Sequence, residues 1–518
     1  MENATNIQRN RVFVPLLLVA MAVRALDFTQ RSLWFDEAVE YLTASATISE
    51  LLSRVATLNY QPPLFASLLH FWLRISLHPV WLRYLPLCLS MLTLAVVIRW
   101  SYERNGPRAA LLAGLVMAFM PTEVYYAQDV GEYALLFFLL TSALYFLDRS
   151  WMTPYWTNWL GWGILSAGAM YTHYGAIIIL VPAAAVTLLG SIWKRQRAVW
   201  QKQLLVSAGL ILSTLPLLIY FLPSQINRGG SGGGWRTYTF PGLGTTVSQF
   251  IELLHHTFLY NFSGGPLSEV STAPTTILLI LLALVLALTI RQLPVHWLLW
   301  TGLALSLYFI LVKLGYYVGG FRYGLIFTPL LVVLIAQALN TLWEKRVALA
   351  TLSLFLLLGV EIYGLPNPTL SGWIREQSTW QPREQMAQTF AYWRTQRETD
   401  DRTFVYYGAV PAFHYYLQAT GVDKEQSKQP VMCDAQESYA VCREYRLFYS
   451  PWSRQLSAEE NVAQLYEMLG QRPDRLWLIF SHVHQEEHRE ILVRLAPAYE
   501  IVQSSNQSAE AAFLLVRR

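Results

Sequence analysis

The sequence predicts an α-helical polytopic membrane protein with a C-terminal α/β domain. Hydrophobic residues fill 54% of the 518 positions and charged residues only 14%, a balance too apolar for a soluble protein of this length. Long apolar segments recur along the first two thirds of the chain, as membrane-spanning helices require. From about residue 366 the composition becomes polar and mixed, and short β-rich runs alternate with helical stretches.

Eleven apolar segments are long enough to cross or nearly cross a bilayer. They lie at about residues 12–27, 80–100, 108–121, 132–148, 157–171, 175–193, 203–222, 274–290, 294–312, 321–341 and 346–363. Only the motif Tyr171-Thr172-His173-Tyr174 separates the fifth from the sixth, so these two could form one bent hairpin. We therefore predict about 11 transmembrane helices in a membrane domain of residues 1–365, followed by an α/β domain of residues 366–518.

The cations between the apolar segments indicate how the chain is oriented. Alternate loops contain Arg99, Arg104, Arg108, Arg149, Lys194, Arg195, Arg197, Lys202, Arg291, Lys345 and Arg346. Because positively charged loops stay in the cytoplasm, these loops and the N-terminus are predicted to be cytoplasmic in a plasma-membrane protein. The loop 27–79 and the C-terminal domain then face outward. A formal charge of +4 distributed in this way is a topology signal and excludes a nucleic-acid partner.

The outward loop 27–79 is predicted to contain amphipathic helices that lie along the membrane surface. Thr47 and Glu50 have the spacing of a capping box, and Pro62-Pro63 opens a helical stretch at the position where a missing N–H costs nothing. In the C-terminal domain, Cys433 and Cys442 could pair if that domain lies outside the cytoplasm.

Four polar motifs fall at the outward ends of apolar segments. They are Asp36-Glu37 after the first segment, Gln128-Asp129 with Glu132 and Tyr133 before the fourth, Thr172-His173-Tyr174 between the fifth and sixth, and Arg322-Tyr323 at the start of the tenth. The topology comes from cations in other loops, so the agreement of the four motifs supports one outward-facing site.

Asp36 is the candidate general base of this site. Carboxylates beside hydrocarbon lose hydration, so acids at a membrane exit indicate function by default, and Glu37 could tune its neighbour. The alternative is a helix N-terminus, where acids favour the dipole; this alternative is the stronger one for Glu40. Asp129 could orient an acceptor, share a metal ion with Glu37, or cap the fourth segment.

His173 and Arg322 are candidate ligand-binding residues. His173 could carry protons or bind a metal ion, or it could form hydrogen bonds within an interfacial aromatic belt. Arg322 lies on the outer side against the positive-inside trend, which favours a phosphate ligand over a residue that anchors the helix end. No residues have a spacing that identifies an ion, so no metal ligand is assigned and a divalent metal ion is left open as a cofactor.

The motifs resemble those of a known enzyme family in order and spacing. The matching stretches are Ser32-Leu33-Trp34-Phe35-Asp36-Glu37-Ala38, Gln61-Pro62-Pro63-Leu64, Tyr126-Ala127-Gln128-Asp129, Tyr171-Thr172-His173-Tyr174 and Arg322-Tyr323. They are similar to motifs of bacterial glycosyltransferases related to protein O-mannosyltransferases and aminoarabinose transferases. The resemblance implies the GT-C fold and inverting transfer of a sugar from a polyprenyl-phosphate carrier to an acceptor hydroxyl on the outer face.

The resemblance also assigns residue roles. It implies that Asp36 is the base, Glu37 its neighbour, Asp129 the second acid and Arg322 a ligand of the carrier phosphate. The further substrate-binding candidates are Tyr323, His173, Gln61, Gln128 and Tyr133. Two positions depart from the family: Gln61 stands where His is usual, and Gly131 stands where relatives often have Arg.

The implied partners are the polyprenyl-phosphate sugar donor, membrane lipids and an acceptor that is a protein, a lipid or a polysaccharide. The transferred sugar is a hexose or a pentose. The alternative function is a transporter or lipid flippase in which the acids and His173 form a proton or substrate path. That function predicts repeat symmetry and acids in mid-span, and the sequence indicates neither. A scaffold without catalytic function leaves the four converging motifs unexplained.

Overall fold

The computed structural model describes residues 13–26, 28–29, 32–57, 59, 61–225, 250–251, 253–255, 257–259, 272–314, 317, 324–365, 385–419, 441–442, 447–449, 457–469, 472–483, 487–505 and 511–518. The chain forms two compact units. The helical unit comprises Met1–Phe28, Thr47–Trp72 and Leu82–Trp380, and the mixed unit comprises Thr29–Ala46, Leu73–Trp81 and Gln381–Arg518. Parts of the outward loop thus cluster with the C-terminal residues, and the division into domains of residues 1–365 and 366–518 stays a prediction.

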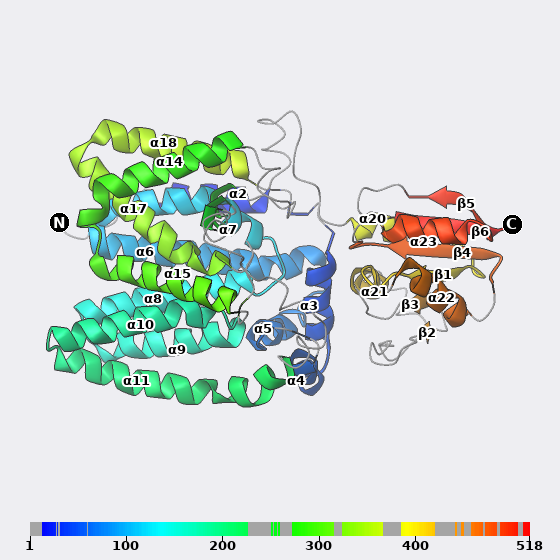
Figure 1. Ribbon diagram of the computed structural model, residues 1–518, viewed down its shortest axis with the longest axis horizontal. Coiled ribbons are helices and arrows are strands. Elements are labelled where there is room, and N and C mark those ends of the chain that lie inside the picture. The colour runs from blue at the N-terminus through cyan, green and yellow to red at the C-terminus, as the bar shows by residue number, and fades with distance from the viewer. Residues whose placement is uncertain are drawn as a thin grey trace. The chain divides into compact units, whose positions relative to one another are not determined.

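Helices make up the described part of the helical unit (Figure 1). They are α2 (Phe13–Ala25), α4 (Ile48–Thr57), α5 (Leu64–Trp72), α6 (Pro79–Phe119), α7 (Pro121–Tyr126), α8 (Tyr133–Met152), α9 (Trp156–Thr172), α10 (Ala176–Trp193), α11 (Arg197–Pro216), α14 (Thr272–Thr289), α15 (Val295–Lys313), α17 (Thr328–Lys345) and α18 (Val347–Gly364), with short turns η1 (Leu217–Phe221), η3 (Ile290–Gln292) and η4 (Leu325–Phe327). Each of the eleven apolar segments falls on one or more of these elements.

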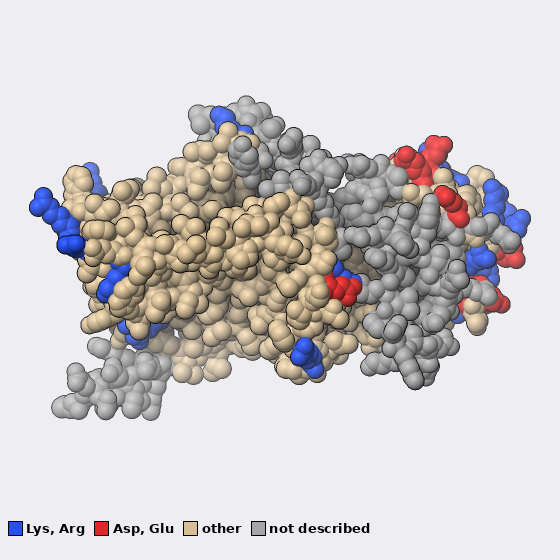
Figure 2. All heavy atoms as spheres, turned by 90° about the horizontal axis from the view of Figure 1, so that it is seen from below, with Lys and Arg blue, Asp and Glu red and all other residues tan. Residues whose placement is uncertain are grey.

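Eight helices in the described ranges are long and apolar enough to cross a membrane. They span Pro79–Phe119, Tyr133–Met152, Ala176–Trp193, Arg197–Gln225, Ala273–Gln292, Val295–Lys313, Leu325–Lys345 and Val347–Gly364. Figure 2 shows that one side of this unit is almost free of charged side chains, as a lipid-facing surface requires. The chain is therefore a multi-pass membrane protein, and the predicted number of 11 spans stays a prediction.

The core of the helical unit joins helices from both ends of its sequence. One buried cluster contains Leu16 of α2, Leu94 of α6, Leu281 of α14, Leu339 of α17 and Leu357 of α18.

The amphipathic helix α4 begins where the sequence predicts. The N–H of Glu50 donates to Thr47 Oγ1 at 3.4 Å.

Helix α6 contains the two apolar segments 80–100 and 108–121 and bends between them. Gly106 has φ 81° and ψ −174°, a conformation open essentially to glycine alone, and Pro107 follows it. No atom lies within 4 Å of the position that a Cβ would take at Gly106. The bend therefore depends on the backbone freedom of glycine and not on space for a side chain.

We expect Gly106→Ala to lower the free energy of unfolding by about 1–3 kcal/mol, because alanine cannot adopt this backbone conformation without strain. Gly209→Ala is the matched control. Gly209 lies inside α11 and also has no atom within 4 Å of its Cβ position, so this change is neutral or stabilising. Thermal unfolding of both variants in detergent tests the difference, and equal melting temperatures would contradict it.

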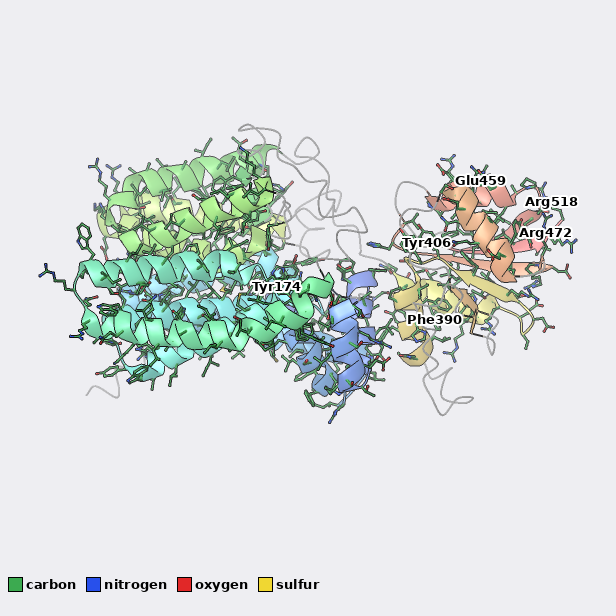
Figure 3. All side chains as sticks on the ribbon, turned by 60° about the horizontal axis from the view of Figure 1, so that its bottom comes forward. Tyr174, Phe390, Tyr406, Glu459, Arg472 and Arg518 are labelled. Atoms are coloured by element: carbon green, nitrogen blue, oxygen red, sulfur yellow. The ribbon has the colours of Figure 1, made fainter. Side chains whose placement is uncertain are left out.

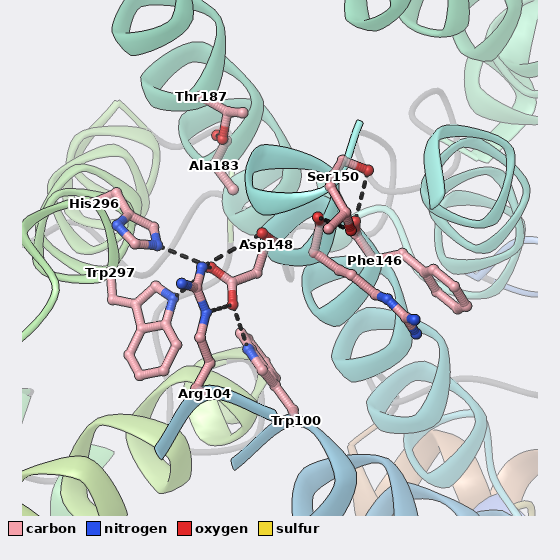
Figure 4. Close-up of polar contacts among 11 residues, drawn as sticks. Trp100, Arg104, Phe146, Asp148, Ser150, Ala183, Thr187, His296 and Trp297 are labelled. Carbon is pink, nitrogen blue, oxygen red and sulfur yellow. Dashed lines mark hydrogen bonds and ion pairs between the residues drawn. The ribbon is translucent and has the colours of Figure 1, made fainter. Parts of the chain in front are cut away.

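A buried carboxylate joins α6, α8 and α15 (Figure 4). Asp148 of α8 accepts hydrogen bonds from Trp100 Nε1 at 2.7 Å and Trp297 Nε1 at 3.0 Å. The Arg104 guanidinium pairs with both of its carboxylate oxygens, and His296 Nε2 lies 2.9 Å from Oδ1. Because every partner is a donor, Asp148 is a fully satisfied buried anion that connects three helices.

The mixed unit is a sheet with helices. Its elements are α3 (Phe35–Ser45), β1 (Arg402–Val405), β2 (Val441–Cys442), β3 (Leu447–Tyr449), β4 (Arg475–Phe480), β5 (Tyr499–Ser504), β6 (Ala511–Arg517), α20 (Met386–Gln396), α21 (Val410–Ala419), α22 (Ala458–Leu469) and α23 (Glu487–Leu495). The strand order is β2-β3-β1-β4-β6-β5, with β1 parallel to β3 and β4 and the other pairs antiparallel. The predicted α/β character of the C-terminal residues is confirmed.

Aromatic and aliphatic side chains together form the buried core of the mixed unit, in which Figure 3 labels Phe390 and Tyr406. The Phe390 ring of α20 lies 5.2 Å from that of Phe413 in α21, and the Tyr406 ring lies 5.5 Å from that of Phe480 in β4. The predicted pairing of Cys433 with Cys442 falls outside the side chains that the structure describes.

Candidate active site

The Asp36-Glu37 motif forms the first turn of α3. The N–H of Trp34 donates to Glu37 Oε2 at 3.3 Å, so this carboxylate, which is 2% exposed, caps its own helix. Asp36 precedes it and is half-buried, with its negative charge at the positive end of the helix dipole. The two neighbouring acids therefore have different environments. Glu37 is buried and caps α3, whereas the side chain of Asp36 is partly accessible.

Contacts with the C-terminal part of the mixed unit hold α3. The N–H of Leu33 donates to the Tyr416 hydroxyl at 2.8 Å, and the Tyr41 hydroxyl donates to Gln418 Oε1 at 3.2 Å. The rings of Tyr41 and Tyr415 meet edge to face at 4.7 Å, and burial raises the pKa of Tyr41 to about 12. This anchoring could not be predicted from the sequence, because its partners are nearly 400 positions apart in the chain.

The Gln128-Asp129 motif follows α7 in the helical unit. Gln128 Nε2 donates to the carbonyl oxygens of Arg24 at 2.6 Å and Leu26 at 2.8 Å. Asp129 is 8% exposed, and a Cβ at Gly131 would lie 3.2 Å from Asp129 Oδ2. Gly131, where relatives often have Arg, thus leaves room for the acid beside it.

A buried chain of polar contacts from Arg24 through Ser90 to Glu123, which the sequence motifs did not predict, supports this turn. Arg24 is 0% exposed and donates to Ser90 Oγ at 3.0 Å and to the carbonyl oxygens of Met117 and Ala118 at 2.9 and 3.0 Å. Ser90 Oγ donates in turn to Glu123 Oε2 at 3.3 Å, and burial raises the pKa of Glu123 to about 7 against the attraction of Arg24. These contacts join the end of α6 to the start of α7, and so support the segment that leads to Asp129. The available signal in the sequence was the charge of Arg24 inside the first apolar segment.

Aromatic rings connect the Asp129 turn to His173. The Tyr133 ring lies 4.6 Å from that of Tyr126 and 5.8 Å from the imidazole of His173. Both His173 and Tyr133 are buried. Two of the predicted motifs therefore lie together in the helical unit, at the start of α8 and the end of α9.

His173 is a neutral hydrogen-bond donor. The N–H of Gly175 donates to Nδ1 at 2.9 Å, which assigns the ring proton to Nε2, and Nε2 has no hydrogen-bond partner among the described residues. Burial lowers the pKa of His173 to about 4, so the imidazole is uncharged at neutral pH. This state suits donation to a ligand better than transport of protons at neutral pH.

The lowered pKa makes stability depend on pH. Between about pH 6.5 and 4 the unfolded chain binds a proton at His173 and the folded chain does not, so the free energy of unfolding falls by about 3 kcal/mol as the pH drops. His173→Asn keeps an acceptor for the Gly175 N–H but does not titrate. We expect it to lose the contribution of His173 and to keep that of His255, whose pKa burial also lowers to about 4. Thermal unfolding of both proteins at pH 7 and pH 4.5 tests the prediction.

His78→Asn is the matched control for this test. His78 Nδ1 also accepts from the N–H two residues ahead, that of Val80 at 3.3 Å, but His78 is exposed. We expect its replacement to leave the pH dependence of the wild type in place. If both variants follow the wild type from pH 7 to pH 4.5, burial of His173 does not control acid stability.

Gln225 connects the Gln61 motif to the turn after α9. Its Nε2 donates to the carbonyl oxygens of Val55 at 2.9 Å and Gln61 at 3.2 Å, and its Oε1 accepts from the Tyr174 hydroxyl at 2.7 Å. Tyr174 is labelled in Figure 3. Gln61 is thus positioned through its backbone. Gln225 is not among the residues that the sequence motifs predict.

The predicted site residues divide into three groups. Gln61, Gln128, Asp129, Tyr133 and His173 lie in the helical unit, and contacts among their motifs bring them together. Asp36 and Glu37 belong to the mixed unit. Arg322 and Tyr323 fall outside the described residues. In the part of the chain that the structure describes, no group of three or more His, Cys, Asp or Glu side chains could hold a metal ion.

Comparisons with known proteins identify relatives of the sequence and of the fold. The sequence profile of the dolichyl-phosphate-mannose-protein mannosyltransferase family matches residues 60–220. No sequence among the curated proteins matches the chain. The resemblance inferred from the motifs is thus confirmed for this part of the chain.

Two solved structures have the same fold. One is ArnT from Cupriavidus metallidurans bound to undecaprenyl phosphate, with 12% identity, a TM-score of 0.53 and coverage of 97% of each chain. The other is the oligosaccharyltransferase of Archaeoglobus fulgidus in the apo form, with 12% identity and a TM-score of 0.50, which covers 90% of this chain and 69% of that one. At such low identity the likeness is one of fold, and the predicted GT-C fold is confirmed.

Proposed function

We propose that this protein is an inverting glycosyltransferase that moves a hexose or pentose from a polyprenyl-phosphate carrier to an acceptor hydroxyl on the outer face of the membrane. The observation that carries the proposal is the match of residues 60–220 to the mannosyltransferase family profile, within a chain that has the GT-C fold. The different environments of Asp36 and Glu37 add support, since a base needs an accessible carboxylate.

Transfer is a direct displacement at the anomeric carbon. Asp36 takes the proton of the acceptor hydroxyl while the acceptor oxygen forms its bond to the anomeric carbon from the face opposite the phosphate. The bond from that carbon to the phosphate oxygen breaks, and polyprenyl phosphate leaves. Arg322 holds the departing phosphate, because a guanidinium matches its oxygens. Attack from the opposite face inverts the configuration of the sugar.

The motifs of the helical unit bind the substrates in this proposal. Asp129 is the second acid, and Gln61, Gln128, Tyr133 and Tyr323 contact the donor or the acceptor. His173 contributes a neutral Nε2–H donor for a phosphate or sugar oxygen, consistent with its lowered pKa and its bond from Gly175. Undecaprenyl phosphate in the ArnT structure supports a polyprenyl phosphate as the carrier class.

The proposed orientation places the N-terminus in the cytoplasm and the mixed unit outside, in the plasma membrane. The cation-rich loops support it. The acceptor is a protein, a lipid or a polysaccharide, each of which offers a hydroxyl group on the outer face.

Release of polyprenyl phosphate tests the proposal. The purified protein in liposomes is given a polyprenyl-phosphate sugar labelled in the sugar, together with extracts that contain candidate acceptors. We expect the label to move to an acceptor in step with release of polyprenyl phosphate. Movement of the intact carrier across the bilayer without cleavage would identify a flippase or transporter instead. The same assay with a chelator tests whether a divalent metal ion is a cofactor.

A further inference from the structure

His482 has an unusual backbone conformation directly after the central strand β4. Its φ is 52°, in the left-handed region. Few residues other than glycine adopt this region, and Asn, Asp and His are the most frequent exceptions. The neighbouring backbone fits this conformation closely. A Cβ at Gly408 would collide with the carbonyl oxygen of Ser481 and lie 3.0 Å from that of His482, so only glycine allows these two turns to pack together.

The turn at His482 lies at the carboxyl ends of two parallel strands. Val405 of β1 pairs with Ile479 of β4, and both strands end within a few residues. Gly408 follows β1 and His482 follows β4, so the close packing of these residues occurs at one edge of the sheet. In open α/β sheets this edge is where functional groups gather.

The imidazole of His482 reaches the first turn of α3. It stacks on the ring of Phe35 with centroids 4.7 Å apart and planes inclined by 14°. Phe35 is 4% exposed and immediately precedes Asp36. Three residues before Phe35, Ser32 Oγ accepts a hydrogen bond from the N–H of Ala387 at 3.1 Å. The residues before Asp36 are thus held by groups that come from far along the chain, the imidazole of His482 and the backbone N–H of Ala387.

We propose that His482 is a positioning residue for Asp36, which it acts on through the Phe35 ring. The left-handed turn after β4 directs the imidazole onto Phe35, and the stack fixes where α3 begins. Because the turn packs closely against Gly408, it has little room to move, and this arrangement holds the base in a fixed place during transfer. The proposal rests on the proposed function for its catalytic consequence, but the positioning itself is measurable without substrate.

His482→Asn removes the imidazole without changing the backbone conformation. Asparagine tolerates the left-handed conformation but has no ring that could stack on Phe35. We expect the backbone amides of 36–40 to exchange with solvent about 2- to 12-fold faster, the range that corresponds to the loss of one aromatic pair. We also expect kcat to fall by about 10- to 100-fold with little change in KM, because Asp36 acts in the chemical step.

His488→Ala is the matched control. It removes another partly buried imidazole of the same unit, whose ring centroid lies 6.2 Å from that of Phe480.

Phe35→Leu completes a double-mutant cycle. It removes the ring on the other side of the stack but keeps an apolar side chain in place. If His482 acts through Phe35, then His482→Asn has little further effect on amide exchange or kcat in the Phe35→Leu background. Additive effects in the double variant, unchanged exchange in His482→Asn, or unchanged kcat despite faster exchange would each overturn the proposal. A wild-type protein that releases no polyprenyl phosphate would refute the proposed function, while the exchange data would still decide whether His482 positions α3.

Discussion

Replacing Asp36 by Asn lowers kcat for release of polyprenyl phosphate by at least about 10²- to 10⁴-fold, the contribution expected of a general base. Asparagine has nearly the same shape as aspartate but cannot accept the acceptor's proton. The change conserves the shape of a half-buried side chain in the first turn of α3, so we expect folding and donor binding to stay largely intact. The measurement is single-turnover release from a labelled carrier sugar, together with donor binding to the same variant.

Glu37→Gln is the matched comparison for this prediction. The glutamine side-chain oxygen still accepts from the Trp34 N–H, so the cap of α3 survives. We expect a much smaller loss of kcat than in Asp36→Asn. If Glu37→Gln abolished turnover and Asp36→Asn did not, the assignment of the two acids would have to be exchanged.

Replacing Asp148 by Ala has the largest expected effect on stability, a loss of about 3–5 kcal/mol. The change leaves the Arg104 guanidinium and the indole N–H groups of Trp100 and Trp297 without their acceptor in the interior of the bundle. Such unpaired buried donors cost their full desolvation energy. The midpoint of denaturant or thermal unfolding in detergent measures the loss.

Two controls separate this effect from the loss of any acid. Asp148→Asn keeps one acceptor oxygen and should cost clearly less than Asp148→Ala. Asp474→Ala removes an acid whose side chain is 91% exposed and pairs with Arg517 at 3.8 Å, and it should change stability by no more than about 0.5 kcal/mol. Equal losses in Asp148→Ala and Asp474→Ala would show that the buried cluster does not hold the helices together.

The helices could be predicted because their signal is local. Apolar length marks the spans, and the Gly106-Pro107 pair marks the bend that separates two of them within α6. The cap of α4 at Thr47 and the strands β1, β4 and β6 also follow from neighbouring residues. Each of these features is encoded within a few positions of where it forms.

The contacts that build the site could not be predicted, because they join distant positions. Arg24 and Glu123 are 99 residues apart, and α3 is held by Tyr416 and His482 from the other end of the chain. The contacts of Asp148 were missed for the same reason. Asp148 and Glu361 both lie inside apolar helices, and the partners of Asp148 come from two other helices. The carboxylate of Glu361, 0% exposed, has no hydrogen-bond partner among the residues that the structure describes.

An experimental structure of the protein with polyprenyl phosphate and an acceptor bound is the most direct test of Asp36 as the base and Arg322 as the phosphate ligand. We expect the lipid phosphate to lie on the Arg322 guanidinium. We expect the Asp36 carboxylate to lie within hydrogen-bond reach of the acceptor hydroxyl, on the side of the sugar opposite the phosphate. A bound complex in which the Asp36 carboxylate is remote from both the acceptor and the phosphate would contradict these assignments.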